Sequence, residues 1–180
     1  MYSTQYQRGA ALITGLIFMV VLTLLAVAAM RTTSLDEKMA GNALSQAAAF
    51  QAAEAALRQG IFAVRSGAVS SVSSFSAGCA SGLCLPATGS TPAWLTVFPF
   101  GQTAPSVSAV NYSGTPLASL ANQPQYILEL LPDVPVSSGN SRGIGRSSSG
   151  GTSTPFRVTA RGWGLAPEAQ TTTQATYLYF

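Results

Sequence analysis

Two cysteines, Cys79 and Cys84, are the only thiols of this 180-residue chain, and four residues separate them. A metal site would need further ligands, and the sequence holds no other cysteine and no histidine. On a chain with an export segment, such a pair in a loop with glycine and serine indicates a disulfide that closes a small ring. A ring this short contributes at most ~2 kcal/mol through chain entropy, so we expect it to shape a loop rather than to hold the fold.

A group of arginines with a tryptophan is the second set of residues that could do chemistry. Guanidinium groups contact phosphates, and aromatic rings stack on bases. A candidate binding surface for DNA, or for a host or abiotic surface, therefore consists of Arg142, Arg146, Arg157, Arg161 and Trp163. The net charge is only +3 and the basic residues are spread along the chain, which favours structural or solvated arginines. A tryptophan between two glycines, Gly162 and Gly164, also fits a core or edge aromatic.

The residues that common enzymes use are missing or scattered. Without histidine there is no ordinary Ser-His-Asp or Cys-His machinery. The six acids form no pair suited to general acid and base catalysis. The segment RGIGR at 142–146 lacks the strand-to-helix setting of a phosphate loop. We therefore expect no catalytic residue, no metal and no cofactor.

The element that must position any site begins at the N-terminus. A polar leader, 1–9, ends in Arg8-Gly9, an uncharged and mostly apolar run fills 10–30, and charge returns at Arg31. About 20 residues at 1.5 Å rise match a bilayer core of ~30 Å. No proline interrupts the chain before Pro86, so we expect one continuous helix with a membrane half, 10–30, and an amphipathic half, 31–65.

Three kinds of export signal fit this N-terminus. An ordinary secretory signal would use Ala26-Val27-Ala28 as its cleavage site, although the apolar run is longer than the usual 7–15 residues. An uncleaved anchor would keep Arg8 inside the cell. Cleavage after Gly9 would leave the apolar run as the mature N-terminus. We favour the third, because the helical pattern continues without a break through the secretory site.

The amphipathic half carries a predicted contact stripe at spacings of three and four. Only one polar residue breaks it, and helix formers dominate 43–58. We expect the stripe to lie under a head domain: Leu35, Met39, Ala43, Gln46, Phe50, Ala53, Leu57, Ile61 and Val64.

Four segments of this half of the chain resemble the N-terminal region of PilX-type minor pilins of type IV pili. They are RGAALI at 8–13, LTLLAVAAMR at 22–31, EKMAGN at 37–42 and AFQAAEAALR at 49–58. The segments FRVTARG at 156–162 and QATY at 174–177 resemble the closing strands of that family more loosely, and 66–155 shows no useful likeness. The resemblance implies an α+β, type IV pilin-like fold with a long N-terminal helix packed on a small antiparallel sheet.

The resemblance also implies a life cycle. A prepilin peptidase would cut after Gly9, Ala10 would be N-methylated, and the subunit would wait as a single-pass protein of the inner membrane, with a cytoplasmic N-terminus and a periplasmic head. Its partners would be other minor pilins, the major pilin and the inner-membrane assembly platform. It would then initiate or cap a pilus at the cell surface and so affect twitching motility and adhesion. The alternatives are a minor pseudopilin of a type II secretion system, and a tip adhesin or DNA-binding subunit.

Thr14 departs from the family pattern at a position that affects where the subunit can sit in the fibre. Most pilins carry glutamate at the fifth mature residue, which here is Thr14, and an aromatic residue or methionine at the first, which here is Ala10. Most also have a proline in the lower helix. A subunit without that carboxylate is expected at a fibre end rather than in the shaft.

The head, 66–180, is predicted as α+β, with the upper helix packed on an antiparallel sheet of three to five strands. Apolar runs or alternation predict strands at 94–98, 126–131, 156–162 and 173–180, the last two paired antiparallel. Gly- and Ser-rich composition predicts loops at 67–82 and 137–154. Within the first loop, Val69, Val72 and Phe75 are candidates to lie on the helix.

Overall fold

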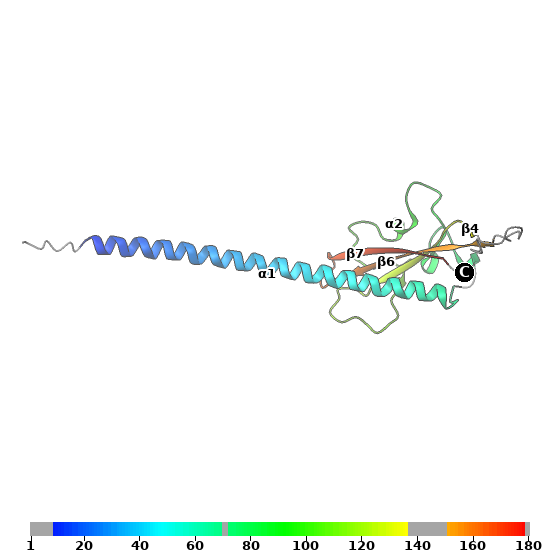
Figure 1. The fold of residues 1–180 in the computed structure, drawn as a ribbon, viewed down its shortest axis with the longest axis horizontal. Helices are drawn as coiled ribbons and strands as arrows, with labels where there is room; N and C mark the ends of the chain where they lie inside the picture. Colours follow the sequence, from blue (N-terminus) through cyan, green and yellow to red (C-terminus); the bar gives the residue numbers. More distant parts are fainter. Residues whose placement is uncertain (1–8, 70–71, 137–150, 179–180) are drawn as a thin grey trace, which may run out of the picture. The chain divides into compact units, whose positions relative to one another are not determined.

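The computed structural model of the chain describes residues 9–69, 72–136 and 151–178. The chain divides into two compact units, 1–43 and 44–180. The helices are α1 (Ala10–Arg65) and α2 (Ala93–Val97), with 3₁₀ turns η1 (Val72–Ser74) and η2 (Ala80–Gly82). The strands are β1 (Leu83–Cys84), β2 (Val110–Asn111), β3 (Gln125–Leu130), β4 (Val134–Val136), β5 (Gly151–Ser153), β6 (Pro155–Trp163) and β7 (Gln170–Leu178) (Figure 1).

The helix α1 confirms the predicted N-terminal helix. It begins at Ala10, directly after the proposed cleavage point, and ends at Arg65. Its sequence has no proline, and alanine, the best helix former, recurs throughout the second half. Beyond it, Gly67 takes a φ of +71°, a backbone conformation that glycine adopts at little cost.

The head contains a sheet in the order β1-β3-β6-β7, with β2 also paired to β3. The β3–β6 and β6–β7 pairs are antiparallel, and the pairing of β6 with β7 confirms the prediction for 156–162 and 173–180. In the register, Arg161 lies opposite Gln125 on β3 and Thr172 on β7. A separate two-stranded pair joins β4 and β5. The sheet is mixed rather than wholly antiparallel, because β1 pairs in parallel with β3. The long connection at 85–124 makes that parallel return feasible.

The predicted strand at 94–98 is wrong, because this segment forms α2. Pro92 is its N-cap residue, and a φ of −61° with a ψ of 145° is the extended conformation usual at that position. Ala93 and Val97, one helical turn apart, are its buried residues. A short apolar run fits a strand or a buried helical turn equally well, so its sequence could not decide. Of the predicted loop at 137–154, 137–150 lies outside the described residues and Gly151–Ser153 forms β5.

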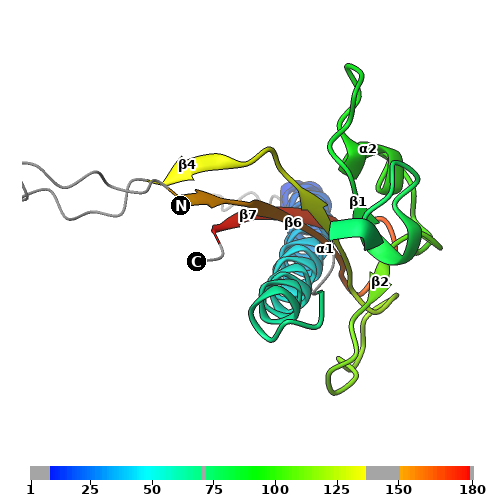
Figure 2. The same cartoon turned by 90° about the vertical axis from the view of Figure 1, so that its right-hand side faces the viewer.

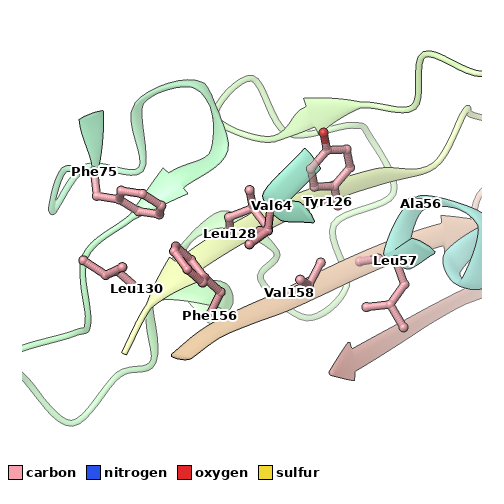
Figure 3. Close-up of a cluster of buried hydrophobic side chains, with 10 residues drawn as sticks. Ala56, Leu57, Val64, Phe75, Tyr126, Leu128, Leu130, Phe156 and Val158 are labelled. Atoms are coloured by element: carbon pink, nitrogen blue, oxygen red, sulfur yellow. The ribbon is translucent and has the colours of Figure 1, made fainter. Parts of the chain in front are cut away.

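The sheet of the head has a hydrophobic cluster on each face. Figure 3 shows the cluster between α1 and the sheet, where Phe75, Leu130 and Phe156 gather near one end and Val158 and Leu57 lie farther along. Figure 2 shows α2 on the side of the sheet away from α1. The cluster on this opposite face includes Phe98, Ile127 and both cysteines, with Ala93 and Val97 of α2. Consecutive residues of β3 therefore serve different clusters, as alternation along a strand requires.

The contact face of α1 differs from the predicted stripe. Its buried residues are mostly small: Ser45, Ala49, Ala52, Ala53, Ala56, Leu57, Gly60 and Val64. Of the predicted stripe, Ala53, Leu57 and Val64 are buried and Ile61 packs partly against the cluster. Leu35, Met39 and Phe50 are exposed, at 59%, 62% and 51%. The structure also differs within the predicted loop at 67–82, since Phe75 is buried and Val69 packs on the cluster, whereas Val72 is 60% exposed.

Close approach explains why small residues make this contact. A Cβ on Gly162 would lie 2.3 Å from both the Ala49 carbonyl oxygen and the Ala53 nitrogen, so β6 meets the backbone of α1 here. One on Gly164 would lie 2.2 Å from the Ser45 carbonyl oxygen. The Ser45 hydroxyl accepts a hydrogen bond from the Leu165 backbone N–H at 3.1 Å. Small side chains on both sides let the helix and the sheet touch without strain.

Candidate assembly helix and head surface

The first part of α1, 10–30, is uncharged and mostly apolar on every side. Large apolar side chains from Leu12 to Met30 are between 47% and 74% exposed. Within the described residues 9–43, the first charged residue is Arg31. The helix is long and apolar enough to cross a membrane, a test that signal sequences also pass. In water such a surface is unfavourable by roughly 25 cal/mol for each Å² of apolar area. The segment therefore fits a lipid or protein environment.

The predicted processing site lies at the start of α1. Gly9 is exposed and stands in a turn immediately before the helix, and Ala10 is its first residue. Among the described residues, none beyond its chain neighbours and the adjoining helix backbone has an atom within 4 Å of the position that a Gly9 Cβ would take. The Gly9–Ala10 bond is therefore at the edge of regular structure, and no distant part of the described chain covers Gly9.

Thr14 satisfies its own hydroxyl within the helix. Its Oγ1 donates toward the carbonyl oxygens of Ala10 and Ala11, each at 3.0 Å. Three further threonines of the same helix bond back to carbonyls three or four residues earlier: Thr23, Thr32 and Thr33. A threonine bonded in this way places no unpaired donor in an apolar environment. Thr14 is thus compatible with a dry site, but it supplies no charge to one.

The predicted disulfide is confirmed. Cys79 and Cys84 are bonded, with an Sγ–Sγ distance of 2.13 Å, and both are buried beneath the α2 face of the sheet. The ring is tight, since Cys79 and Ser81 have φ values of 55° and 52° and Gly82 has one of 73°. Its last two residues, Leu83 and Cys84, form β1 and pair with β3. The bond therefore fixes a short loop against the sheet, as expected for a small ring.

The described members of the predicted ligand surface, Arg157, Arg161 and Trp163, do not form a common exposed surface. Trp163 is fully buried, so its ring cannot stack on a base, and its Nε1 has no hydrogen-bond partner within the described ranges. Arg157 is bonded to the buried Glu129 at 3.2 Å, which neutralises that carboxylate. Arg142 and Arg146 lie outside the described residues. The prediction of a ligand surface is therefore wrong for Arg161 and Trp163, which are buried, and for Arg157, which is paired with Glu129.

Arg161 is a structural cation of the head. Its guanidinium donates to the carbonyl oxygens of Phe98 at 2.6 Å and Pro99 at 3.0 Å, and lies 5.1 Å from the centroid of the Phe98 ring. Its Nε also donates to the Thr172 hydroxyl at 3.3 Å. Burial lowers the pKa of Arg161, because desolvation penalises its charged form. The side chain ties the end of α2 to the sheet and is not available to a ligand.

Sequence reasoning missed the residues that let the helix and sheet meet. Gly60, Gly162 and Gly164 are glycines whose added Cβ atoms would come within 2.5 Å of other atoms across this contact. The small residues at 45, 49, 52, 56 and 60 recur at intervals of three and four, which is a helical signal. Among the described residues, no three acidic, cysteine or histidine side chains gather in a way that could hold a metal ion.

Two family models match the chain. Residues 8–58 match the model described as PilX N-terminal, and residues 80–179 match the model described as type IV pilus assembly protein PilX C-term. No curated protein and no solved structure gives a significant match. The two matched segments include α1 up to Arg58 and all seven strands.

Proposed function

The chain belongs to the PilX family of type IV pilus assembly proteins, and from this premise we propose that it is a minor pilin that initiates or caps the pilus at its tip. The helix α1 supports the proposal. Its uncharged first half is exposed on all sides and suits a bilayer before assembly and a fibre core afterwards. The transfer exchanges one non-aqueous environment for another, so little hydrophobic free energy is lost when the subunit is extracted.

Maturation is the first step of the proposal. A prepilin peptidase cleaves after Gly9, and the new amine of Ala10 is N-methylated. The position of Gly9 directly before α1 supports this, because a cut there frees the whole helix. Until extraction, the inner membrane holds the subunit with its head in the periplasm, beside the assembly platform. Mass spectrometry of the mature protein tests this step, and a terminus at Ala29 would establish secretory cleavage instead.

Thr14 is the observation that favours the fibre end. A shaft subunit with glutamate at this place can pair with the amine of a neighbour, whereas the Thr14 hydroxyl bonds only to carbonyls of its own helix. An unpaired charge in an apolar medium costs at least ~2.5–3.5 kcal/mol on insertion scales. At the tip the contact that needs the carboxylate is not made. The amine of Ala10 could still reach a glutamate of another subunit.

Deletion of the gene tests the role in initiation. We expect surface pili to fall sharply while the pool of major pilin stays unchanged, and we expect the Thr14→Ala variant to restore piliation because it removes only a self-bonded hydroxyl. Thr14→Glu should be tolerated or should admit the subunit to the shaft. Unchanged piliation after deletion would argue against an initiating role. If the Thr14→Ala variant did not restore piliation, the Thr14 hydroxyl itself would be needed, and the missing carboxylate would not explain the place of the subunit.

A further inference from the structure

A groove between the last turns of α1 and the loop after β2 carries two arginines without a partner. It has a volume of about 560 Å³, and its lining includes Arg58, Phe62, Arg65 and Tyr112. Arg58 and Arg65 are exposed and have no ion pair or hydrogen bond in the described part of the chain. Phe62 lies between them in sequence and is 66% exposed. None of the acids in the described part of the chain lines the groove.

The residue types of the groove are those of a protein interface. Arginine, tyrosine and phenylalanine are enriched at the centres of interfaces, and the groove has all three. Residues three, four and seven apart share one face of a helix, so Arg58, Phe62 and Arg65 form a single stripe. An exposed phenylalanine flanked by two cations is suited to a partner that is both apolar and acidic.

The far wall of the groove is fixed before any partner arrives. The Ser113 backbone N–H donates to the Gln59 Oε1 at 3.1 Å, and the Gln59 Nε2 donates to the Ser113 hydroxyl. The Tyr112 ring lies directly over Gly114, since a Cβ there would be 2.2 Å from the Tyr112 hydroxyl. A wall held in this way loses little conformational entropy on binding, which favours affinity.

We propose that this groove binds an extended acidic segment of another pilus subunit, an inference that rests on the proposed role in assembly. Arg58 and Arg65 stand seven residues apart, or about 10 Å along the helix axis. In a segment with the extended polyproline II conformation, which has three residues per turn and rises about 3.1 Å per residue, two carboxylates three residues apart share one face and span about the same distance. The apolar side chains between the two acids project to either side of that face, and one of them meets Phe62.

The chain's own acids do not fit this spacing, so the partner is a different subunit. Asp36 and Glu37 are adjacent, and Glu54 stands alone in sequence. Glu129 is buried and paired with Arg157, which leaves Asp133 and Glu168 as separate single charges. A nucleic acid is disfavoured, because two phosphate contacts release few counterions and give weak binding.

The test uses the full chain in an uncharged detergent and a fluorescent hexapeptide in which two glutamates flank two apolar residues. Fluorescence anisotropy should show that this peptide binds about tenfold more tightly than its glutamine counterpart. The Arg58→Ala, Arg65→Ala double variant should lose that preference, and raised salt should weaken it. Arg31→Ala, an exposed arginine of the same helix outside the groove, is the matched control and should behave as the wild type.

Equal binding of the two peptides, or an unchanged preference in the double variant, would overturn the inference. So would tighter binding of a single-stranded oligonucleotide of equal charge that depends on the same arginines, because the groove would then serve a nucleic acid. Neither result touches the role in assembly, which the deletion experiment tests separately. In cells, a photo-crosslinking residue in place of Phe62 should attach to an acidic segment of another pilin, and attachment only to a second copy of this chain would contradict the choice of partner.

Discussion

Gly162→Ala tests the close contact between α1 and the sheet. The added Cβ would lie 2.3 Å from two backbone atoms of α1, the Ala49 oxygen and the Ala53 nitrogen, and real Cβ atoms essentially never come that close. Backbone atoms cannot rotate away as a side chain can, so the helix must move off β6. Overpacking typically costs 1–3 kcal/mol, and we expect the upper end, about 3 kcal/mol. Domains are stable by only about 5–15 kcal/mol, so this is a large fraction.

Urea unfolding of the full chain in detergent, followed by near-ultraviolet circular dichroism, measures the effect. Trp163 is buried beside the changed residue and supplies the signal. In a thermal scan the expected loss corresponds to a fall in Tm of about 10 °C. Gly89→Ala is the matched control, because nothing lies within 4 Å of its Cβ and its φ is not positive. We expect it to change stability by less than about 1 kcal/mol. Equal stability of the two variants would refute the account of the contact.

Three further predictions concern the head. Arg161→Met removes the charged donor of the Phe98 and Pro99 carbonyls and should cost about 2–3 kcal/mol in urea unfolding, while Arg161→Lys should recover only part of it. Cys84→Ser should cost at most ~2 kcal/mol and leave the far-ultraviolet spectrum unchanged, and thiol titration of the unreduced wild type should find no free thiol. Burial raises the pKa of Tyr126, so the unfolded state loses this proton first and stability should fall as pH rises above about 10, a slope that Tyr126→Phe should reduce.

Local patterns predicted the elements that depend on neighbours in sequence. The uninterrupted apolar and alanine-rich stretch predicted α1, and the alternation at 156–162 predicted β6 and its antiparallel partner β7. Contacts between distant segments were harder to predict. The parallel pairing of β1 with β3 depends on a return over 85–124, which no local pattern encodes.

The errors at the helix and the arginines share one physical cause. The spacing of large apolar residues such as Phe50 predicts the wrong contact face, because the close approach of β6 at Gly162 admits only small side chains. The nearness in sequence of charged and aromatic residues predicts a ligand surface, but strand alternation and burial place Arg161 and Trp163 in the interior. In both cases, which side chains are buried depends on how closely two elements approach, and residue type alone does not determine that distance.

The place of the subunit in the fibre is the central claim, and immunogold labelling of wild-type pili tests it most directly. Antibodies against the head, checked on the deletion strain, should label few sites, and those should lie at fibre ends. Labelling spread evenly along the shaft would contradict the proposal.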